Sequence, residues 1–420
     1  MTGATQAPPE PPVSLSATQE KWLLWTLAGI QFSHILDFTL MMPLGPMLIE
    51  ALAISTREFA LLVSAYSLSA GIAALLISSC IDRFERKRLL LGIFVLFIAA
   101  TSLCALAQGY HSLLAARALA GAAGGILGAM VQTLVGDLIA PPRRGRATGI
   151  VMSAFSVAAI VGLPVSLSLA SYFSWRVPFF FTAAVAALFL LLSLRVLPQV
   201  PVMQHGRPQG LAGTLLPMWQ VLRQPHLLNA ILFVTFGVFS AFCVTPFITL
   251  YLTGNVGIAA QDIALVYLCG GLATFFSNRY IGKLSDQLGH GRTFMLLGGF
   301  SVLAIWVQTN MPQMPLLYVV VLSLLFFVLI PGRSVPAMAL VTALPSMQQR
   351  GAFMALIAAA RQLASGSAAY LAGLLVVTGE QGQLQGFTHA GYLAIGVTLL
   401  TLWQSHRLQL SAQAVQPLKA

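Results

Sequence analysis

The chain alternates between about a dozen apolar runs, each of roughly 20 to 27 residues, and short polar segments that hold nearly all of its charge. An α-helix rises about 1.5 Å per residue, so about 20 apolar residues cross the roughly 30 Å hydrocarbon core of a bilayer. Hydrophobic residues make up 58% of the chain and charged residues only 8%, whereas soluble domains hold about 25% charged residues. The pattern therefore predicts an all-α membrane protein.

Twelve of these runs are long enough to be transmembrane helices. The longer ones must tilt or protrude to fit a bilayer of ordinary thickness. The predicted helices cover residues 22–48, 58–81, 89–108, 112–139, 147–172, 177–197, 227–252, 260–282, 294–310, 315–341, 353–378 and 388–406.

The distribution of positive charge predicts the orientation of these helices. With the N-terminus in the cytoplasm, the loops and tails on that side hold 17 of the 22 Lys and Arg residues. Cytoplasmic loops carry such an excess, so we expect a multi-pass protein of the plasma or inner membrane with both termini in the cytoplasm. The formal net charge of +11 is spread over short loops, which argues against nucleic-acid binding and for contact with anionic lipid.

The longest polar interval divides the predicted helices into six and six. It lies between Leu197 and His226, and one continuous helix is disfavoured there by Pro198, Pro201, Pro208, Gly206, Gly210 and Gly213. The first 20 residues are polar and rich in proline, so they are expected to form a disordered tail. The expected organisation is a cytoplasmic tail (1–20), a six-helix bundle (21–197), a cytoplasmic linker (198–226), a second bundle (227–407) and a cytoplasmic tail (408–420).

The two groups of helices repeat each other in sequence. Four pairs of residues, in two different cytoplasmic loops of each half, are related by one offset of 204 residues. The pairs are Asp82 and Asp286, Arg88 and Arg292, Pro141 and Pro345, and Arg146 and Arg350. A shared register over two loops indicates a duplicated unit, so we predict twelve transmembrane helices as two pseudo-symmetric six-helix bundles around a site near the bilayer midplane.

Four segments resemble signatures of the major facilitator superfamily. Two of them are similar to its loop between helices 2 and 3, one to its helix-4 arginine motif, and one to the helix-5 signature of its exporters. They read Ser78-x3-Asp82-Arg-x-Glu-Arg-Lys-Arg88, Gly282-x3-Asp286-x2-Gly289-x2-Arg292, Arg117-Ala-Leu-Ala-Gly121, and Gly162-Leu-Pro164 followed by Trp175-Arg176. The chain departs from these signatures at Ser78, Glu85 and Ser166, where glycines are usual.

The resemblance covers essentially all twelve helices and is strongest toward drug and sugar efflux members of the proton antiporter group. It implies a secondary transporter that works by alternating access, with export favoured over uptake. The expected partners are a small-molecule substrate, protons and the lipid bilayer, and a monomer suffices for this mechanism. Proton-coupled uptake, uniport of a metabolite and a membrane sensor that transports nothing stay open as alternatives.

The two loop signatures also imply a latch at the cytoplasmic end. Asp137 lies near the cytoplasmic end of the fourth helix, so it is a candidate partner for the Asp82 loop or for Arg361 in a contact that breaks as the halves rock. Gly162 and Pro164 are candidate hinge residues, with ordinary helix packing as the alternative. The latch residues are Asp82, Arg83, Arg86, Arg88, Asp137, Gly282, Asp286, Gly289 and Arg292.

Asp37 is the only acidic residue deep in any predicted helix, and His34 lies one turn earlier on the same face. A carboxylate at this depth is costly unless it is paired or protonated, so its charge depends on its neighbours. We therefore predict that Asp37 is the main protonation and substrate-sensing residue. The alternative is a structural Asp that bonds to His34 or Arg117 and only ties helices together.

Three arginines also lie inside apolar runs. Arg117 enters the fourth helix from the outside and can reach the depth of Asp37; the resemblance gives it a role in proton transfer, and snorkelling to the outer interface is the alternative. Arg333 and Arg361 are expected to face the central cavity or a carboxylate. Together with Asp37 and His34, these arginines form the predicted proton and substrate site.

Other classes of function lack support in the sequence. The seven histidines form no HExxH pattern and no Ser-His-Asp pattern, so neither an enzyme nor a metal site is expected. No ATP-binding P-loop is present, so ATP is not expected to be the direct energy source, and no cofactor is expected. Phe and Met residues around Asp37 and in the seventh helix favour an amphipathic or aromatic substrate over a highly hydrated one.

Overall fold

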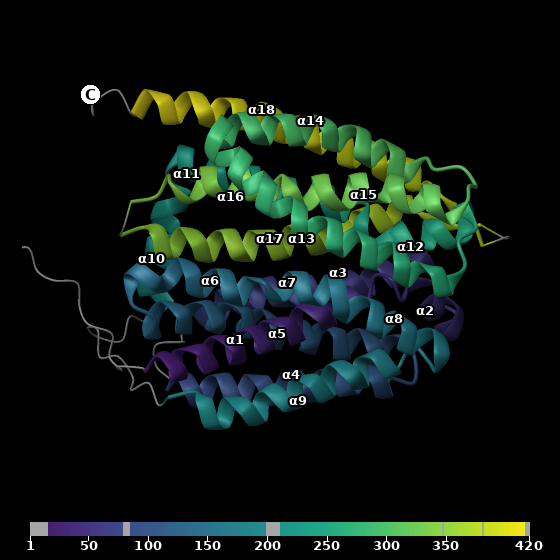
Figure 1. Ribbon diagram of the computed structural model, residues 1–420, viewed down its shortest axis with the longest axis horizontal. Coiled ribbons are helices and arrows are strands. Elements are labelled where there is room, and N and C mark those ends of the chain that lie inside the picture. Colours follow the sequence, from purple (N-terminus) through teal and green to yellow (C-terminus); the bar gives the residue numbers. More distant parts are fainter. Residues whose placement is uncertain (1–15, 79–84, 199–210, 347, 380–381, 416–420) are drawn as a thin grey trace, which may run out of the picture.

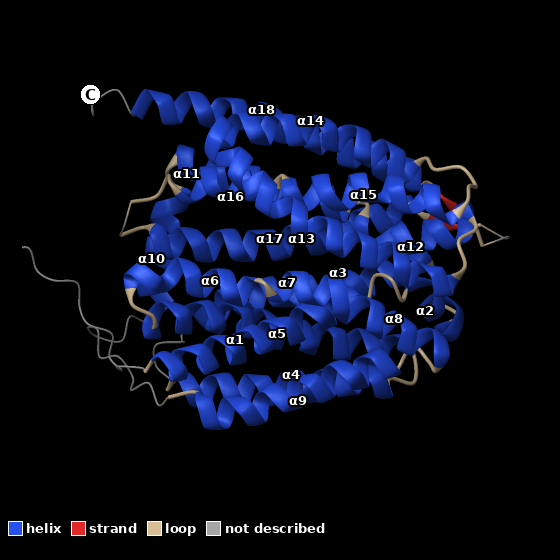
Figure 2. Cartoon of the chain, viewed as in Figure 1, coloured by secondary structure: helices blue, strands red, loops and turns tan. Residues whose placement is uncertain are grey.

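The computed structural model describes residues 16–78, 85–198, 211–346, 348–379 and 382–415. Nearly all of these residues are helical, and the helices lie in two bundles side by side with their axes roughly parallel (Figures 1 and 2). One bundle comes from the N-terminal half of the chain and the other from the C-terminal half. The predicted fold class, twelve transmembrane helices in two six-helix bundles, is confirmed.

The N-terminal bundle contains six membrane-crossing segments, two of which are divided into shorter helices. Its elements are α1 (Ala17–Leu40), α2 (Gly45–Leu52), α3 (Thr56–Ser78), α4 (Arg86–Leu106), α5 (Tyr110–Leu138), η2 (Pro141–Arg143), α6 (Arg144–Met152), α7 (Ala154–Val157), η3 (Ala158–Gly162), α8 (Leu163–Tyr172) and α9 (Val177–Val196). The start of α1 is fixed by a capping box in which Ser16 and Gln19 exchange two hydrogen bonds.

The C-terminal bundle repeats this plan after a short helix in the linker, α10 (Leu211–Leu222). Its elements are α11 (Pro225–Phe242), η4 (Thr245–Phe247), α12 (Ile248–Tyr251), η5 (Leu252–Val256), η6 (Ala260–Asp262), α13 (Ile263–Leu288), α14 (His290–Thr309), α15 (Leu316–Gly332), α16 (Ser334–Thr342), α17 (Arg350–Leu375) and α18 (Phe387–Val415). Two short strands, β1 (Val377–Thr378) and β2 (Leu384–Gln385), form an antiparallel pair between α17 and α18.

Ten of the membrane-crossing segments are both long and apolar enough to be recognised as spans by length and composition. The other two, α17 and α18, have 26 and 29 residues and are long enough, but their mean hydropathy is lower. In α17 the pair Arg361 and Gln362 contributes to this difference. Polar residues in a membrane helix favour a position inside the bundle, which fits the contacts of both helices.

Proline and glycine interrupt four of the membrane-crossing segments where the sequence indicates. A turn at residues 41–44 separates α1 from α2, and a π-helix, η3, precedes the Leu163-Pro164 pair. Pro246 lies in the 3-10 turn η4, and α15 ends at Gly332 just after Pro331. A proline removes a backbone donor and crowds the preceding turn, so the regular helix ends or changes pitch there.

The bundle has two distinguishable ends. We call the end where α1 begins, α10 lies and α18 stops the linker end, and the opposite end, which carries β1 and β2, the hairpin end (Figure 1). At the hairpin end, the buried apolar residues of both halves form one continuous cluster, with members such as Leu48 and Phe59 from the N-terminal half and Phe247 and Phe387 from the C-terminal half.

At the linker end, the apolar residues instead form two separate clusters. One contains only N-terminal residues, among them Leu27, Phe94 and Leu134. The other contains only C-terminal residues, among them Phe233 and Phe353. In the described part of the chain, the two halves therefore share a core at the hairpin end and have independent cores at the linker end.

Close contacts at glycines hold α3 against α5 of its own half and against α17 of the other half. A methyl group on Gly121 or Gly125 of α5 would overlap the backbone of α3, so the glycine-rich stretch of α5 is a packing surface, as its spacing indicates. On the other side of α3, a methyl group on Gly373 of α17 would overlap Ala60. The helices α3 and α17 thereby form a tight seam between the two bundles.

Candidate functional site

The N-terminal half contains a fully buried ion pair between α1 and α5. Nη1 of Arg117 donates to Oδ2 of Asp37 at 3.0 Å and to the Asp37 carbonyl oxygen at 3.1 Å. Both side chains have an exposed fraction of 0%. Arg117 therefore does not snorkel to the surface, and the structure brings together the two residues that the sequence places at similar depth.

Tyr66 of α3 completes this site. The guanidinium carbon of Arg117 lies 4.5 Å from the centre of the Tyr66 ring, a cation–π contact, and the Tyr66 hydroxyl donates to the His34 carbonyl oxygen at 3.1 Å. Within the described residues, Oδ1 of Asp37 and Nη2 of Arg117 are buried and make no hydrogen bond. The pair thus holds one free carboxylate oxygen, a position that can accept a proton or a donor group.

His34 does not contact Asp37 by a hydrogen bond, although it lies one turn before it on α1. Its ring faces Gly128 of α5, whose added methyl group would lie 3.4 Å from both Cε1 and Nε2. Nε2 of His34 is buried and has no hydrogen-bond partner among the described residues. The sequence allows His34 or Arg117 as the bonded partner of Asp37, and the structure shows the bond to Arg117.

The C-terminal half contains a second buried arginine, with different partners. Arg333, at the break between α15 and α16, is 3% exposed. Its Nη1 donates to Oγ1 of Thr398 at 3.1 Å, and its Nη2 donates to the Gly237 carbonyl oxygen and to Oγ of Ser240, each at 3.1 Å. These partners are neutral, so none of the described carboxylates pairs with Arg333, and the other expectation, that Arg333 faces the central cavity, stays a prediction.

Hydroxyl groups around Arg333 are themselves bonded into the surrounding helices. Ser240 Oγ lies 2.6 Å from Thr398 Oγ1, and each hydroxyl lies within bonding distance of the Ala394 carbonyl oxygen of α18. The buried guanidinium of Arg333 thereby connects the break between α15 and α16 to α11 and α18. Burial of an unpaired charge is tolerated only when its donors are satisfied, and this network supplies three acceptors.

Arg361 of α17 is half-buried and makes no hydrogen bond and no ion pair within the described part of the chain. Ile357 and Ser365, one turn before and after it, are both buried. Neither Asp137 nor another described carboxylate contacts Arg361, so the expected pair of Asp137 and Arg361 does not form.

An aromatic contact closes the space between the halves beside the Asp37 site. Phe38 of α1 lies 5.8 Å, between ring centres, from Phe242 of α11, and 5.5 Å from Tyr66. Both Phe side chains pack against the shared cluster of the hairpin end. The acidic site of the N-terminal half therefore lies just below the closed end of the molecule.

Comparison with known proteins identifies this architecture. The sequence profile of the Major Facilitator Superfamily matches residues 27–369. The chain belongs to the major facilitator superfamily. Members are membrane transporters, so the protein is a transporter rather than an enzyme.

Individual relatives of the superfamily are distant. An uncharacterised transporter of this type from Bacillus subtilis, YtbD, is 25% identical over 85% of this chain and 89% of its own length. A probable sugar efflux transporter from Mannheimia succiniciproducens is 27% identical over 53% of this chain and 55% of its own length. Among solved structures, a bacterial homologue of the human lysosomal transporter Spinster, in an inward-facing and unoccupied conformation, superposes with a TM-score of 0.73 at 14% identity, covering 94% of this chain and 98% of the other.

The superfamily loop signature of the first half lies partly outside the described residues, which do not include Asp82 and Arg83. Of the rest, Nε of Arg86 lies 3.2 Å from Oδ2 of Asp137, and Arg88 pairs with Glu85 at 2.6 Å. The Arg86 and Asp137 pair joins the start of α4 to the last turn of α5. It therefore lies within the N-terminal bundle and does not bridge the two halves in this conformation.

The second copy of the signature is built differently. Gly289 has a φ of 87° and makes the turn between α13 and α14, a conformation that favours glycine. Asp286, in the last turn of α13, and Arg292, in α14, form no ion pair within the described residues. Gly282 faces open space, and instead of an ion pair, Ser285 Oγ lies 2.7 Å from Nδ1 of His290.

The candidate hinge of the superfamily's fifth helix lies against α1. A methyl group on Gly162 would lie 2.8 Å from Cδ1 of Leu36, so this glycine permits close packing of η3 on α1. Pro164 lies in the first turn of α8, directly after η3, so its missing backbone donor falls where the helix changes from π to α pitch. The role of Gly162 and Pro164 as a hinge stays a prediction, and close packing already accounts for Gly162.

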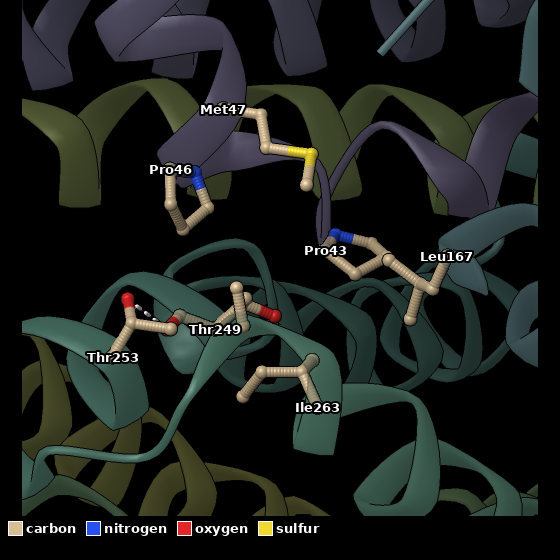
Figure 3. A pocket seen from close by; sticks show the side chains of 8 residues that line it. Pro43, Pro46, Met47, Leu167, Thr249, Thr253 and Ile263 are labelled. Carbon is tan, nitrogen blue, oxygen red and sulfur yellow. Dashed lines mark hydrogen bonds between the residues drawn. The ribbon is translucent and has the colours of Figure 1, made fainter. Parts of the chain in front are cut away.

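A small pocket lies between the halves at the hairpin end, and Figure 3 shows its lining. Pro43 and Pro46 face it from the N-terminal half, and Thr249, Thr253 and Ile263 face it from the C-terminal half. Thr253 donates its hydroxyl to the Thr249 carbonyl oxygen at 3.0 Å, so this group is already bonded. The lining holds no charged side chain, and the pocket belongs to the closed seam rather than to the buried charges.

Several residues of the two charged sites cannot be recognised from the sequence. Ser240, Thr398 and Gly237 are residue types common in membrane helices, and no spacing distinguishes them. Tyr66 offers a weak signal, since an aromatic ring with a polar group inside an apolar run often has a bonded partner. The pairing partners of Arg333 therefore emerge only from the structure.

Proposed function

We propose that the protein exports a small organic molecule in exchange for protons by alternating access, and that Asp37 is its proton site. The observation that carries the proposal is the buried pair of Asp37 and Arg117 at the closed end of the bundle. Protonation of Asp37 removes one charge of the pair and releases Arg117, so it changes the stability of the conformation that buries both. This dependence is the property that couples a proton to a conformational change.

The proposal assigns the linker end to the cytoplasm. Basic residues gather at this end, among them Lys21, Arg143, Arg144, Lys283 and Arg350, as the excess of positive charge in cytoplasmic loops requires. The core that the two halves share then lies toward the outside, and their independent cores lie toward the cytoplasm. Similarity to a probable sugar efflux transporter over about half of the chain supports export as the direction.

A proteoliposome assay tests the proposal. The purified protein is reconstituted with a pH-sensitive dye in the lumen, and a panel of amphipathic compounds is screened for proton flux that the compound evokes. We expect flux in the wild type and none in Asp37→Asn. The matched control is Asp262→Asn, the same substitution at the end of η6, where the side chain makes no hydrogen bond or ion pair among the described residues.

The alternatives give different results in the same assay. Equal proton flux in wild type and Asp37→Asn would reject Asp37 as the proton site. Movement of the compound without any proton movement would indicate uniport, and proton movement in the same direction as the compound would indicate coupled uptake. A correctly folded protein that moves none of the compounds would favour a sensor.

A further inference from the structure

The charges inside the two bundles are unequal. In the N-terminal half, Arg117 is neutralised by Asp37, which is the only buried Asp or Glu among the described residues. In the described part of the C-terminal half, the only carboxylates are Asp262 and Asp286, which lie at the two ends of α13. Arg333 and Arg361 therefore carry two positive charges into this bundle without a counterion.

Arg333 sets a permanent positive charge near the middle of α11. It is held by Thr398, Ser240 and the Gly237 carbonyl, none of which can take up its charge. A guanidinium stays protonated at every accessible pH. Since the protein supplies hydroxyls and a carbonyl rather than a carboxylate, the field at this position stays attractive to an anion.

Arg361 has the same sign and lies at a similar depth. It follows the start of α17 by eleven residues, and Gly237 follows the start of α11 by twelve, while both helices begin at the linker end and pack against each other. Unlike Arg333, Arg361 has donors that no described residue uses, and its side chain is less completely buried. It is the arginine that can still receive a ligand.

Open space adjoins Gly237, the residue whose carbonyl oxygen accepts a hydrogen bond from Arg333. No atom lies within 4 Å of the position that a methyl group on Gly237 would take, although the Gly237 carbonyl is bonded to Arg333. Next to Gly237, Phe236 is only half-buried, as is Phe239.

We infer that the transported compound is an organic anion, and that its anionic group binds Arg361 in the positive field of Arg333. The inference rests on the transport function proposed above and names the chemical class of its substrate. A carboxylate, sulfonate or phosphate forms charge-assisted hydrogen bonds with a guanidinium fork. Phe236 and Phe239 offer apolar surface to the rest of such a molecule. A neutral compound leaves both charges unpaired, and a cation is repelled by them.

The assigned class also fits the direction of export. A membrane potential that is negative inside drives an anion out of the cytoplasm, so the electrical gradient assists its exit. The anion site lies in the C-terminal half and Asp37 lies in the N-terminal half, so the proton and the substrate bind different atoms.

Binding of matched aromatic probes to the purified protein tests the inference. Each set in the panel shares one ring system and differs in charge, as in naphthoate, naphthalenemethanol and naphthylmethylammonium, with sulfonate and phosphate analogues added. Equilibrium dialysis at neutral pH should show the best anion of the panel binding at least about tenfold more tightly than its neutral and cationic partners. No preference for the anionic members across the panel would overturn the inference.

Two variants locate the site. Arg361→Gln should weaken binding of the preferred anion about tenfold or more and leave binding of its neutral partner unchanged, and Arg361→Lys should retain part of the affinity. Arg57→Gln is the matched control, because Arg57 is exposed at the hairpin end and makes no hydrogen bond or ion pair within the described residues. Equal affinity for the anion in wild type and Arg361→Gln would refute the assignment.

Flux measurements separate this inference from the proposed function. An inside-negative potential, set with a potassium gradient and valinomycin, should accelerate exit of the preferred anion from liposomes in the wild type and not in Arg361→Gln. Transport of neutral or cationic compounds alone would overturn the anion assignment and keep the carrier. Anion binding that depends on Arg361, without any flux, would keep the site and overturn the transport proposal.

Discussion

Arg117 and Arg333 are two deeply buried arginines, one in each half, and their hydrogen-bond partners differ in charge. Arg117 is bonded to a carboxylate, whereas Arg333 is bonded to two hydroxyls and a carbonyl. A carboxylate can take up a proton near its partner, but a hydroxyl or a carbonyl cannot. The N-terminal half can therefore change its net charge by one proton, while the C-terminal half holds a constant positive charge.

The largest effect is expected when the N-terminal site loses its carboxylate. Asp37→Asn leaves Arg117 buried without a counterion, with only the neutral oxygens of residue 37 as hydrogen-bond acceptors. We expect proton-coupled flux to disappear and the free energy of unfolding to fall by about 3 kcal/mol, because an unpaired buried charge is strongly destabilising. Dye-monitored flux and thermal unfolding in detergent measure the two effects.

A double variant checks the cause of that loss. Asp37→Asn with Arg117→Gln removes both charges and should recover most of the stability without recovering proton coupling. If the double variant were no more stable than Asp37→Asn alone, the loss of stability would not come from the unpaired charge of Arg117.

The reverse experiment gives the C-terminal site a carboxylate. Ser240→Asp places an acid next to Nη2 of Arg333, which now lies 3.1 Å from the serine hydroxyl. The new carboxylate should neutralise Arg333 and weaken binding of the preferred anionic probe about tenfold. The control is Ser240→Asn, because asparagine is nearly equal in size to aspartate but neutral, so this variant should retain the affinity. Equal loss of affinity in both variants would mean that size, not charge, is responsible.

A smaller effect is expected at Tyr66, which has no counterpart around Arg333. Tyr66→Phe removes the hydrogen bond to the His34 carbonyl and keeps the ring under Arg117, so the stability should fall by about 1 kcal/mol with transport retained. Tyr66→Leu removes the ring as well and should be less stable by a further amount of similar size. Thermal unfolding compares the three proteins.

The smallest effect concerns the linker end, where the halves differ again. Residues related to Arg86 and Asp137 by the 204-residue offset are His290 and Val341, which form no ion pair. The Arg86 and Asp137 pair is partly exposed, so Asp137→Asn should lower stability by about 1 kcal/mol or less. Spectroscopic distances between labels on the two halves report the populations of the conformations. If this pair also acts as a latch, Asp137→Asn should change these populations; unchanged populations would mean that the pair is a local contact.

Much of the fold follows from the sequence because a bilayer imposes a simple rule. Each crossing needs about 20 apolar residues with every backbone group bonded inside the helix, so the spans and their interruptions at proline are predictable. The helix α10 and the β1 and β2 pair were not expected, since they lie outside the spans, where that rule does not apply. Capping at Ser16 also starts α1 before the predicted boundary of the first helix.

The charged sites are predictable only in part. Asp37 and Arg117 are conspicuous because charges are rare in the spans, and their depths match. The partners of Arg333 come from α11 and α18, which are distant in sequence, and serine and threonine hydroxyls usually bond to their own helix. Whether such a hydroxyl turns toward an arginine is decided by packing between helices, which no local pattern encodes.

If the proposed coupling through Asp37 holds, its position as the only buried carboxylate of the described residues also limits how far the protein can concentrate its substrate. If this group carries the coupling proton, one turnover exchanges one proton through it. Each unit of pH difference across the membrane then sustains about a tenfold concentration ratio of solute, to which the membrane potential adds its own contribution. This stoichiometric ceiling is independent of affinity and of turnover rate.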